Sequence, residues 1–231
     1  MLVSLMYHHS NYRKNIGLNI SPHKIEKHIL YLLSNDFNII FPGETCRNNR
    51  KNIILTFDDG YKDFYQFSYP ILRKHKVKAV LGVITSKVPS EVKGEYCNLD
   101  EIREMANSNL IEIASHSHFH SNRCHENYKN LTLSKKVIEE ITGKVCKTFI
   151  APYGCGSFID ILRTLRVYRH IMLICNGAMN FDSSRIIYRM RADHVNDLSS
   201  LLSEKTFSNF RLLSCQVKCI VKYLLKYSLH R

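Results

Sequence analysis

Asn52–Gly60 reads NIILTFDDG, a continuous apolar run that ends in two aspartates and a glycine. A short apolar run bounded by a turn signal is typical of a strand buried on both faces, as strands of a parallel sheet are. Further apolar runs lie at residues 2–7, 79–85, 111–114, 148–151 and 170–175, and segments with helical signals separate most of them. This alternation predicts an α/β fold built around a parallel sheet.

The helices between these strands are marked by their ends. Ser21 followed by Pro22 is typical of a helix N-terminus, with Ser21 as the N-cap and Pro22 in the first turn. Further helices are predicted at 99–108, at 133–142 with Gly143 as the C-terminal cap, and at 158–167.

Polar residues follow three of the predicted strands at the point where each strand ends. Asp58 and Asp59 follow strand 52–57, the segment 115–120 (SHSHFH) follows strand 111–114, and the segment 152–154 (PYG) follows strand 148–151. The carboxyl ends of the strands of a parallel α/β barrel lie on one face, where active sites form. We therefore expect these three segments to meet.

Two adjacent carboxylates would repel each other in one pocket unless a cation took one of them as a ligand. In that arrangement one aspartate binds a divalent metal and the other acts as a base on water. The alternative is that Asp58-Asp59-Gly60 is only a turn before a helix N-terminus.

His116 and His120 are four residues apart, so on one helical turn both imidazoles would face the same metal. Two histidines and one aspartate form a facial triad that leaves positions open for water and substrate. Such a set suits Zn²⁺, Co²⁺, Ni²⁺ or Fe²⁺. The PYG segment would offer a backbone N–H to the oxyanion of a hydrolysed amide, or it is only a turn.

These segments resemble the motifs of the polysaccharide deacetylases, also called carbohydrate esterase family 4. The resemblance covers about residues 2–195 and rests on residues 5–8 (LMYH), 56–61 (TFDDGY), 115–120 (SHSHFH) and 149–154 (FIAPYG). It implies a distorted (β/α) barrel with fewer than eight strands. It also implies that Asp58 is the catalytic base, that Asp59, His116 and His120 bind the metal, usually zinc, and that Tyr153 lies at the oxyanion site.

Two positions depart from the family pattern. An arginine often precedes the Pro-Tyr-Gly stretch and orients the base, but Ile150 and Ala151 stand there in this chain. The usual late histidine that serves as the general acid has no clear counterpart. His194, which follows Asp193, and His8 are the two candidates.

The chain of 231 residues carries 33 Lys and Arg against 20 Asp and Glu, and the basic residues are spread along it. Diffuse charge without a nucleic-acid motif favours a solvated basic surface over a nucleic-acid site. Residues 206–231 are expected to form a basic amphipathic helix, separate from a catalytic domain at 1–205. That helix either packs on the barrel or lies on an anionic membrane and brings the site to a lipid-linked sugar.

The eight cysteines form no CxxC pair, which predicts reduced thiols in a cytoplasmic protein. No signal peptide is visible, so we expect a cytoplasmic location, with peripheral contact at the inner membrane face if the helix binds lipid.

The function expected from these residues is metal-dependent removal of N-acetyl groups from an N-acetylhexosamine-containing glycan. The alternatives are an O-acetyl esterase acting on a polysaccharide and a degenerate, non-catalytic glycan-binding module.

Overall fold

The computed structural model describes residues 2–13, 18–45, 51–88, 94–121, 128–154, 158–175, 180 and 185–202. The predicted helix at 206–231 lies outside these residues. The strands are β1 (Leu2–Tyr7), β2 (His9–Ser10), β3 (Asn19–Ile20), β4 (Asn38–Ile39), β5 (Asn52–Phe57), β6 (Ala79–Val83), β7 (Ile111–Ser115), β8 (Thr148–Ile150), β9 (His170–Ile174) and β10 (Ile186–Arg191). The helices are α1 (Pro22–Ser34), α2 (Tyr69–His75), α3 (Leu99–Asn107), α4 (Tyr128–Thr142), α5 (Phe158–Val167) and α6 (Leu198–Leu201), with short turns η1 (Phe64–Ser68), η2 (Thr85–Lys87) and η3 (Pro152–Gly154).

Within the described residues, seven parallel strands close into a barrel. Their order is β1-β10-β9-β8-β7-β6-β5, and β5 returns to pair with β1 along its whole length. Strand β5 also has β4 as a neighbour. Strand β4 pairs with Asn52 and Ile53 at the start of β5, whereas β6 pairs with Thr56 and Phe57 at its end. The expectation of a distorted (β/α) barrel with fewer than eight strands is confirmed.

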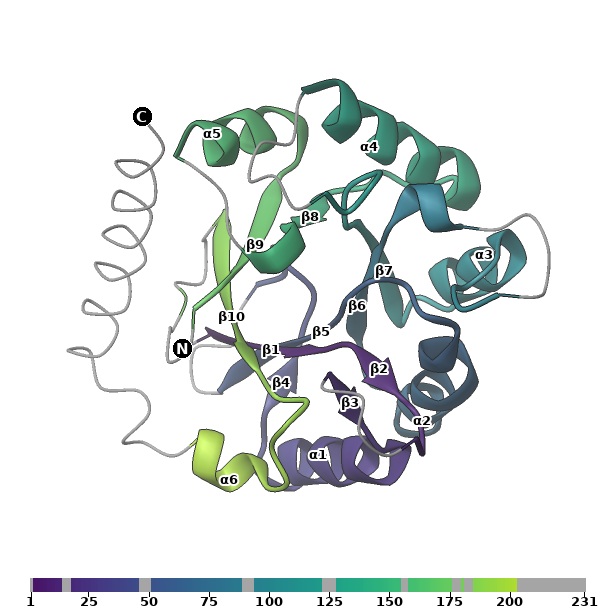
Figure 1. Cartoon of the computed structure of the whole chain (residues 1–231). Coiled ribbons are helices and arrows are strands. Elements are labelled where there is room, and N and C mark those ends of the chain that lie inside the picture. The colour runs from purple at the N-terminus through teal and green to yellow at the C-terminus, as the bar shows by residue number, and fades with distance from the viewer. Residues whose placement is uncertain are drawn as a thin grey trace.

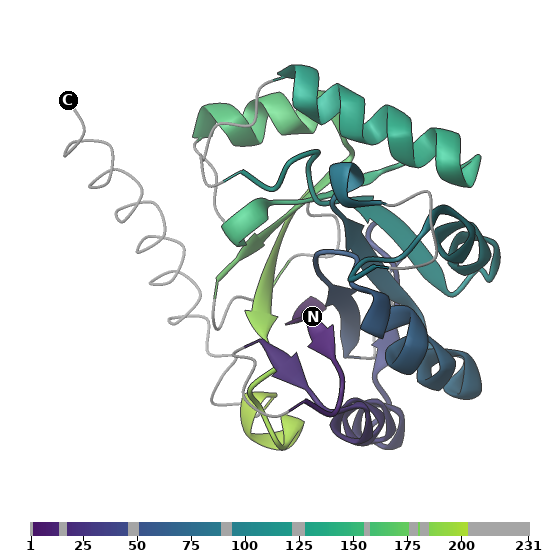
Figure 2. The ribbon, with the colours of Figure 1, turned by 45° about the vertical axis from the view of Figure 1, so that its right-hand side comes forward.

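Helices α1 to α5 surround the strands (Figures 1 and 2). Ser21 caps α1 as predicted, with its hydroxyl accepting from the N–H of Lys24, and Asn98 and Glu101 form a capping box on α3. Helix α4 begins at Tyr128, five residues before the predicted start at 133. None of the described helices is long and apolar enough to cross a membrane.

One buried residue from each of the seven barrel strands contributes to a single apolar layer inside the barrel. This layer contains Leu2, Ile54, Val80, Ala114, Ile150, Met172 and Ile187, and Ile40 packs beneath it. Side chains on a strand alternate between its two faces, so residues two or four positions further along also face the interior axis. That rule places Thr56, Asp58, His116 and Arg189 on the inner face, towards the carboxyl end of the barrel.

One of the cysteines in the described part of the chain differs from expectation. Cys97 and Cys146 are free and buried, but Cys175, directly after β9, is disulfide-bonded. The expectation of reduced thiols is therefore wrong for Cys175, and the cytoplasmic location loses that support and stays a prediction.

Candidate active site

Asp59, His116 and His120 meet at the carboxyl end of the barrel. The Nε2 atoms of His116 and His120 lie 3.3 and 3.4 Å from Oδ1 of Asp59, and the three ligand atoms all lie within 4.8 Å of one another. Two atoms that each bind one zinc ion at about 2.1 Å with tetrahedral angles lie roughly 3.4 Å apart. The spacing of these side chains therefore fits one divalent cation.

A backbone carbonyl fixes the orientation of His116. The oxygen of Ile150 lies 2.8 Å from Nδ1 of His116, so Nδ1 carries the proton and Nε2 is left as the ligand atom. Gly82 makes room for this ring, because a Cβ there would lie 2.9 Å from Ile150 Cδ1 and 3.5 Å from His116 Cβ. The close approach of β6 to β7 and β8 thus depends on a residue without a side chain.

The two histidines do not lie on a helical turn, which was the geometry inferred from their spacing. Ser117 and His120 have φ values of 64° and 51°, and the segment after β7 is a loop. The hydroxyl of Ser117 accepts from the N–H of His120 at 2.9 Å and closes this loop. The left-handed residues turn the chain back, so that both imidazoles still reach Asp59.

Asp59 is held as a carboxylate by its partners. Burial opposes its ionisation, but the hydrogen bond and charge of His116 lower the pKa of Asp59 to about 2. Burial alone would lower the pKa of His116, yet the neighbouring Asp59 and Asp58 raise it above its usual value. The pKa of His120 is lowered by burial and by the charge of His116.

The carboxylate of Asp58 forms hydrogen bonds with an arginine that the sequence motifs did not reveal. The guanidinium of Arg189, from β10, donates to Oδ1 and Oδ2 of Asp58 at 2.5 and 3.0 Å and to Oγ1 of Thr56 at 2.9 Å. Both side chains are buried, at 0% and 3% exposure. Burial by itself would raise the pKa of Asp58, but the charge of Arg189 and its hydrogen bonds lower it below the usual value. An arginine before the Pro-Tyr-Gly stretch often orients the base, but Ile150 and Ala151 stand there in this chain. Arg189, from a different strand, contacts the same carboxylate instead.

His8 reaches the same pocket from the end of β1. Its Nε2 lies 4.0 Å from Oδ2 of Asp58, and its Nδ1 lies 3.1 Å from Oδ2 of Asp193. Arg191 donates to the other oxygen of Asp193 at 3.1 Å. His194, the other candidate for the general acid, has a side chain that is 64% exposed and lies 3.5 Å from Asp193. Of the two candidates, His8 is the one that lies within 4.0 Å of Asp58.

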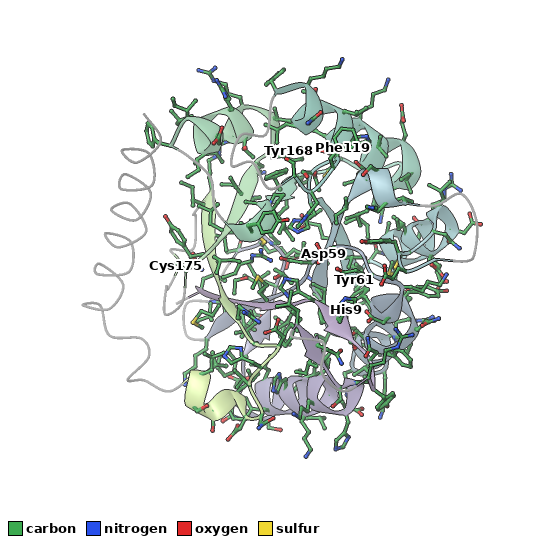
Figure 3. All side chains as sticks on the ribbon, in the orientation of Figure 1. His9, Asp59, Tyr61, Phe119, Tyr168 and Cys175 are labelled. Atoms are coloured by element: carbon green, nitrogen blue, oxygen red, sulfur yellow. The ribbon has the colours of Figure 1, made fainter. Side chains whose placement is uncertain are left out.

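Aromatic side chains lie near Asp59, His116 and His120. Tyr153 has a φ of 57° and is 55% exposed, and its ring centroid lies 4.9 Å from that of His120. Phe119, which lies between His116 and His120 in the sequence, is 58% exposed (Figure 3). Gly154 allows the turn after Tyr153, because a Cβ there would overlap Ile174. The structure thus brings all three predicted segments to one face of the barrel.

Comparison with known proteins agrees with this geometry. A family model described as polysaccharide deacetylase matches residues 46–166. The poly-β-1,6-N-acetyl-D-glucosamine N-deacetylase of Staphylococcus aureus (strain MRSA252) is 27% identical over 176 residues, which are 66% of this chain and 60% of that protein. The chain spans between 41% and 60% of the length of the curated relatives that it matches.

Solved structures share the fold. A polysaccharide deacetylase from Bacillus cereus superposes with a TM-score of 0.78 at 24% identity, covering 90% of this chain and 69% of that one. The Streptococcus pyogenes deacetylase PplD, solved in complex with acetate, gives a TM-score of 0.77 at 20% identity, covering 90% and 98%.

Proposed function

Because this chain belongs to the polysaccharide deacetylase family, we propose that it is a metal-dependent hydrolase that removes N-acetyl groups from an N-acetylhexosamine-containing glycan. The observation that carries the proposal is the convergence of Asp59, His116 and His120 beside the Asp58–Arg189 pair. The name of the staphylococcal relative makes β-1,6-linked N-acetylglucosamine oligomers the first substrates to test. Zinc is the metal that this donor set favours, and Co²⁺, Ni²⁺ and Fe²⁺ are the alternatives.

Each residue of the site has its own role in the proposed reaction. Asp59, His116 and His120 would hold a divalent cation, which when bound would supply Lewis acidity to the acetyl carbonyl and to water. Asp58 accepts the proton of the attacking water, and Arg189 keeps its carboxylate ionised and aimed. The backbone N–H of Tyr153 donates to the oxyanion that develops on the carbonyl oxygen.

Breakdown of the tetrahedral carbon requires a proton on the departing nitrogen. We assign this step to His8, because Asp193 holds its Nδ1 and leaves Nε2 directed towards the pocket, 4.0 Å from Asp58. The C–N bond breaks, the amine leaves with the proton of His8, and acetate remains. An ester substrate would need less help from His8, because an alkoxide is a better leaving group than an amide nitrogen.

The deciding experiment measures acetate release from N-acetylglucosamine oligomers before chelation, after chelation, and after zinc is restored. Activity that disappears and returns supports the proposal. Asp58→Asn is expected to retain zinc and lose turnover, whereas His116→Ala is expected to lose both. Acetate release only from O-acetylated sugars would favour the esterase, and no metal binding would favour the non-catalytic glycan-binding module.

A further inference from the structure

Helix α4 carries a serine on the face that packs against the barrel. The buried residues of α4 are Leu131, Ser134, Ile138 and Ile141, so Ser134 is the polar member of an otherwise apolar face. This helix packs on the outside of β7 (Figure 1). Ser134 is 0% exposed, and a buried hydroxyl requires hydrogen-bond partners.

The partner of Ser134 on the barrel is Ser115, the last residue of β7. Ala114 faces the barrel interior, so the side chain of Ser115 points outward to α4. The hydroxyl oxygens of the two serines lie 2.8 Å apart, and both side chains are buried. The phenol of Tyr168 lies 3.0 Å from the hydroxyl of Ser134 and donates to the carbonyl of Leu131 at 2.8 Å. Tyr168 and α4 thus hold Ser134 against the end of β7.

Ser115 in turn contacts the loop that carries His120. Its oxygen accepts from the N–H of Ser117 at 3.3 Å, and the hydroxyl of Ser117 accepts from the N–H of His120 at 2.9 Å. Ser117 has a φ of 64°, and a left-handed conformation is unfavourable for a residue with a Cβ. Such a conformation persists only where the surrounding structure fixes it, and the bond to Ser115 is one of the contacts that do so.

The same loop is bonded to η2 on another side. The N–H of Thr85 donates to the carbonyl of Ser117 at 3.2 Å, and the N–H of Ser86 donates to the carbonyl of His118 at 3.0 Å. These bonds fix carbonyl groups of the loop, whereas the bond to Ser115 fixes the N–H of Ser117. Loss of the serine contact is therefore expected to loosen the turn without unfolding it.

We propose that Ser134 is a positioning residue of the metal site, which acts on His120 through Ser115 and Ser117. The inference rests on the proposed function in that it takes His120 as a metal ligand. The hydroxyl of Ser134 fixes that of Ser115, and Ser115 holds the turn at Ser117 that directs the imidazole. Since Nε2 of His120 lies only 3.4 Å from Oδ1 of Asp59, a small rotation of the turn moves one ligand atom away from the others.

The test is the zinc dissociation constant of the full chain, measured by competition with a chromophoric chelator. Ser134→Ala removes the hydroxyl, and its zinc affinity is expected to fall about 3–10-fold, as for the loss of one hydrogen bond. Ser134→Cys keeps a side chain of similar size with a weaker donor, so its affinity is expected to lie between those of the wild type and Ser134→Ala.

Ile138→Val is the matched control, because Ile138 lies on the same buried face of α4 and this change removes one methylene group. The variant is expected to lose stability and to keep the zinc affinity of the wild type. Equal losses of zinc affinity in Ser134→Ala and Ile138→Val would overturn the inference.

A double variant tests whether Ser134 acts through Ser115. Ser115→Ala removes the acceptor of the Ser117 N–H, so its zinc affinity is expected to fall at least as far as that of Ser134→Ala. Adding Ser134→Ala is then expected to cause no further loss, because the hydroxyl that Ser134 fixes is already gone. Fully additive losses of zinc affinity would contradict this route.

The visible spectrum of the cobalt-loaded protein separates positioning from a general loss of stability. Its ligand-field bands are expected to shift in Ser134→Ala and to stay unchanged in Ile138→Val. Wild-type zinc affinity and an unchanged cobalt spectrum in Ser134→Ala would overturn the inference and leave the proposed function standing. A wild-type chain that binds neither ion would overturn both.

Discussion

Replacing Arg189 with methionine is the most informative perturbation of this barrel, because it removes a charge while keeping a long apolar side chain. Arg189 is 0% exposed and forms a forked ion pair with Asp58, which is 3% exposed. Removing one partner of a buried ion pair costs about 3–5 kcal/mol, since the other charge is left without compensation. For a chain of this size each kcal/mol lowers Tm by about 2–4 °C, so a fall of roughly 6–20 °C is expected.

The pH dependence of this loss has a definite sign. In the wild type the pKa of Asp58 is lowered, so the pair stabilises the fold above the ordinary aspartate pKa and loses this contribution as pH falls through the lowered value. Without Arg189, burial raises the pKa of Asp58 above its usual value, and protonation relieves the uncompensated charge. The difference in stability between variant and wild type is therefore expected to be largest near pH 7 and to shrink towards acid pH.

The assay is urea unfolding of the metal-free proteins at neutral and acid pH, because a bound cation would partly replace the missing charge. Arg191→Met on the same strand is the control, and its cost is expected to be smaller, because that side chain is 36% exposed and Asp193 keeps His8 as a partner. Asp58→Asn completes a double-mutant cycle. Wild-type stability of Arg189→Met at pH 7, or strictly additive costs in the cycle, would refute the reasoning.

Three further predictions address other parts of the chain. His8→Gln is expected to lower kcat on N-acetyl substrates by about 10²–10⁴-fold. Its kcat on an activated acetate ester is expected to stay near the wild-type value, because that leaving group needs no proton, and His194→Gln is expected to stay near wild type on both substrates. Equal losses of kcat in His8→Gln on the two substrates would exclude the acid role. Burial raises the pKa of Glu112 from 4.5 to about 7, so the folded state loses stability as pH rises through this range. In urea unfolding, the free energy of unfolding of Glu112→Gln is expected to exceed that of the wild type by about 3 kcal/mol at pH 8 and to match it near pH 4. Flotation with anionic liposomes of the full chain and of a chain lacking 206–231 separates the two predictions for that segment: equal flotation is expected if the segment packs on the barrel and would reject the membrane role, whereas greater flotation of the full chain would support it.

Local sequence signals were sufficient for most of the barrel. The run Asn52–Phe57 is β5 at the predicted bounds, and 158–167 is α5. Strands buried on both faces are continuous apolar runs, so their positions can be read from neighbouring residues alone. The approach of Asp59 to His116 was predictable for a related reason, since both residues lie just after the carboxyl end of such a strand.

The strand β10 was not predicted, because its sequence, IIYRMR, places two arginines among apolar residues. An arginine in an alternating strand is usually read as facing solvent, yet Arg189 points into the barrel. Nothing local to β10 reveals the carboxylate that compensates its charge, since Asp58 is 131 residues away in sequence.

The sequence by itself therefore determined the fold class, the order of the strands with apolar runs and the identity of the groups after them. The tertiary structure decided which groups meet. Closure of the barrel between β1, β5 and β10 brings His8, Asp58 and Arg189 together, and left-handed residues in the loop after β7 turn His120 back towards Asp59. The physical reason is that burial of an ion pair and convergence of ligands depend on contacts between segments distant in sequence, which no local pattern encodes.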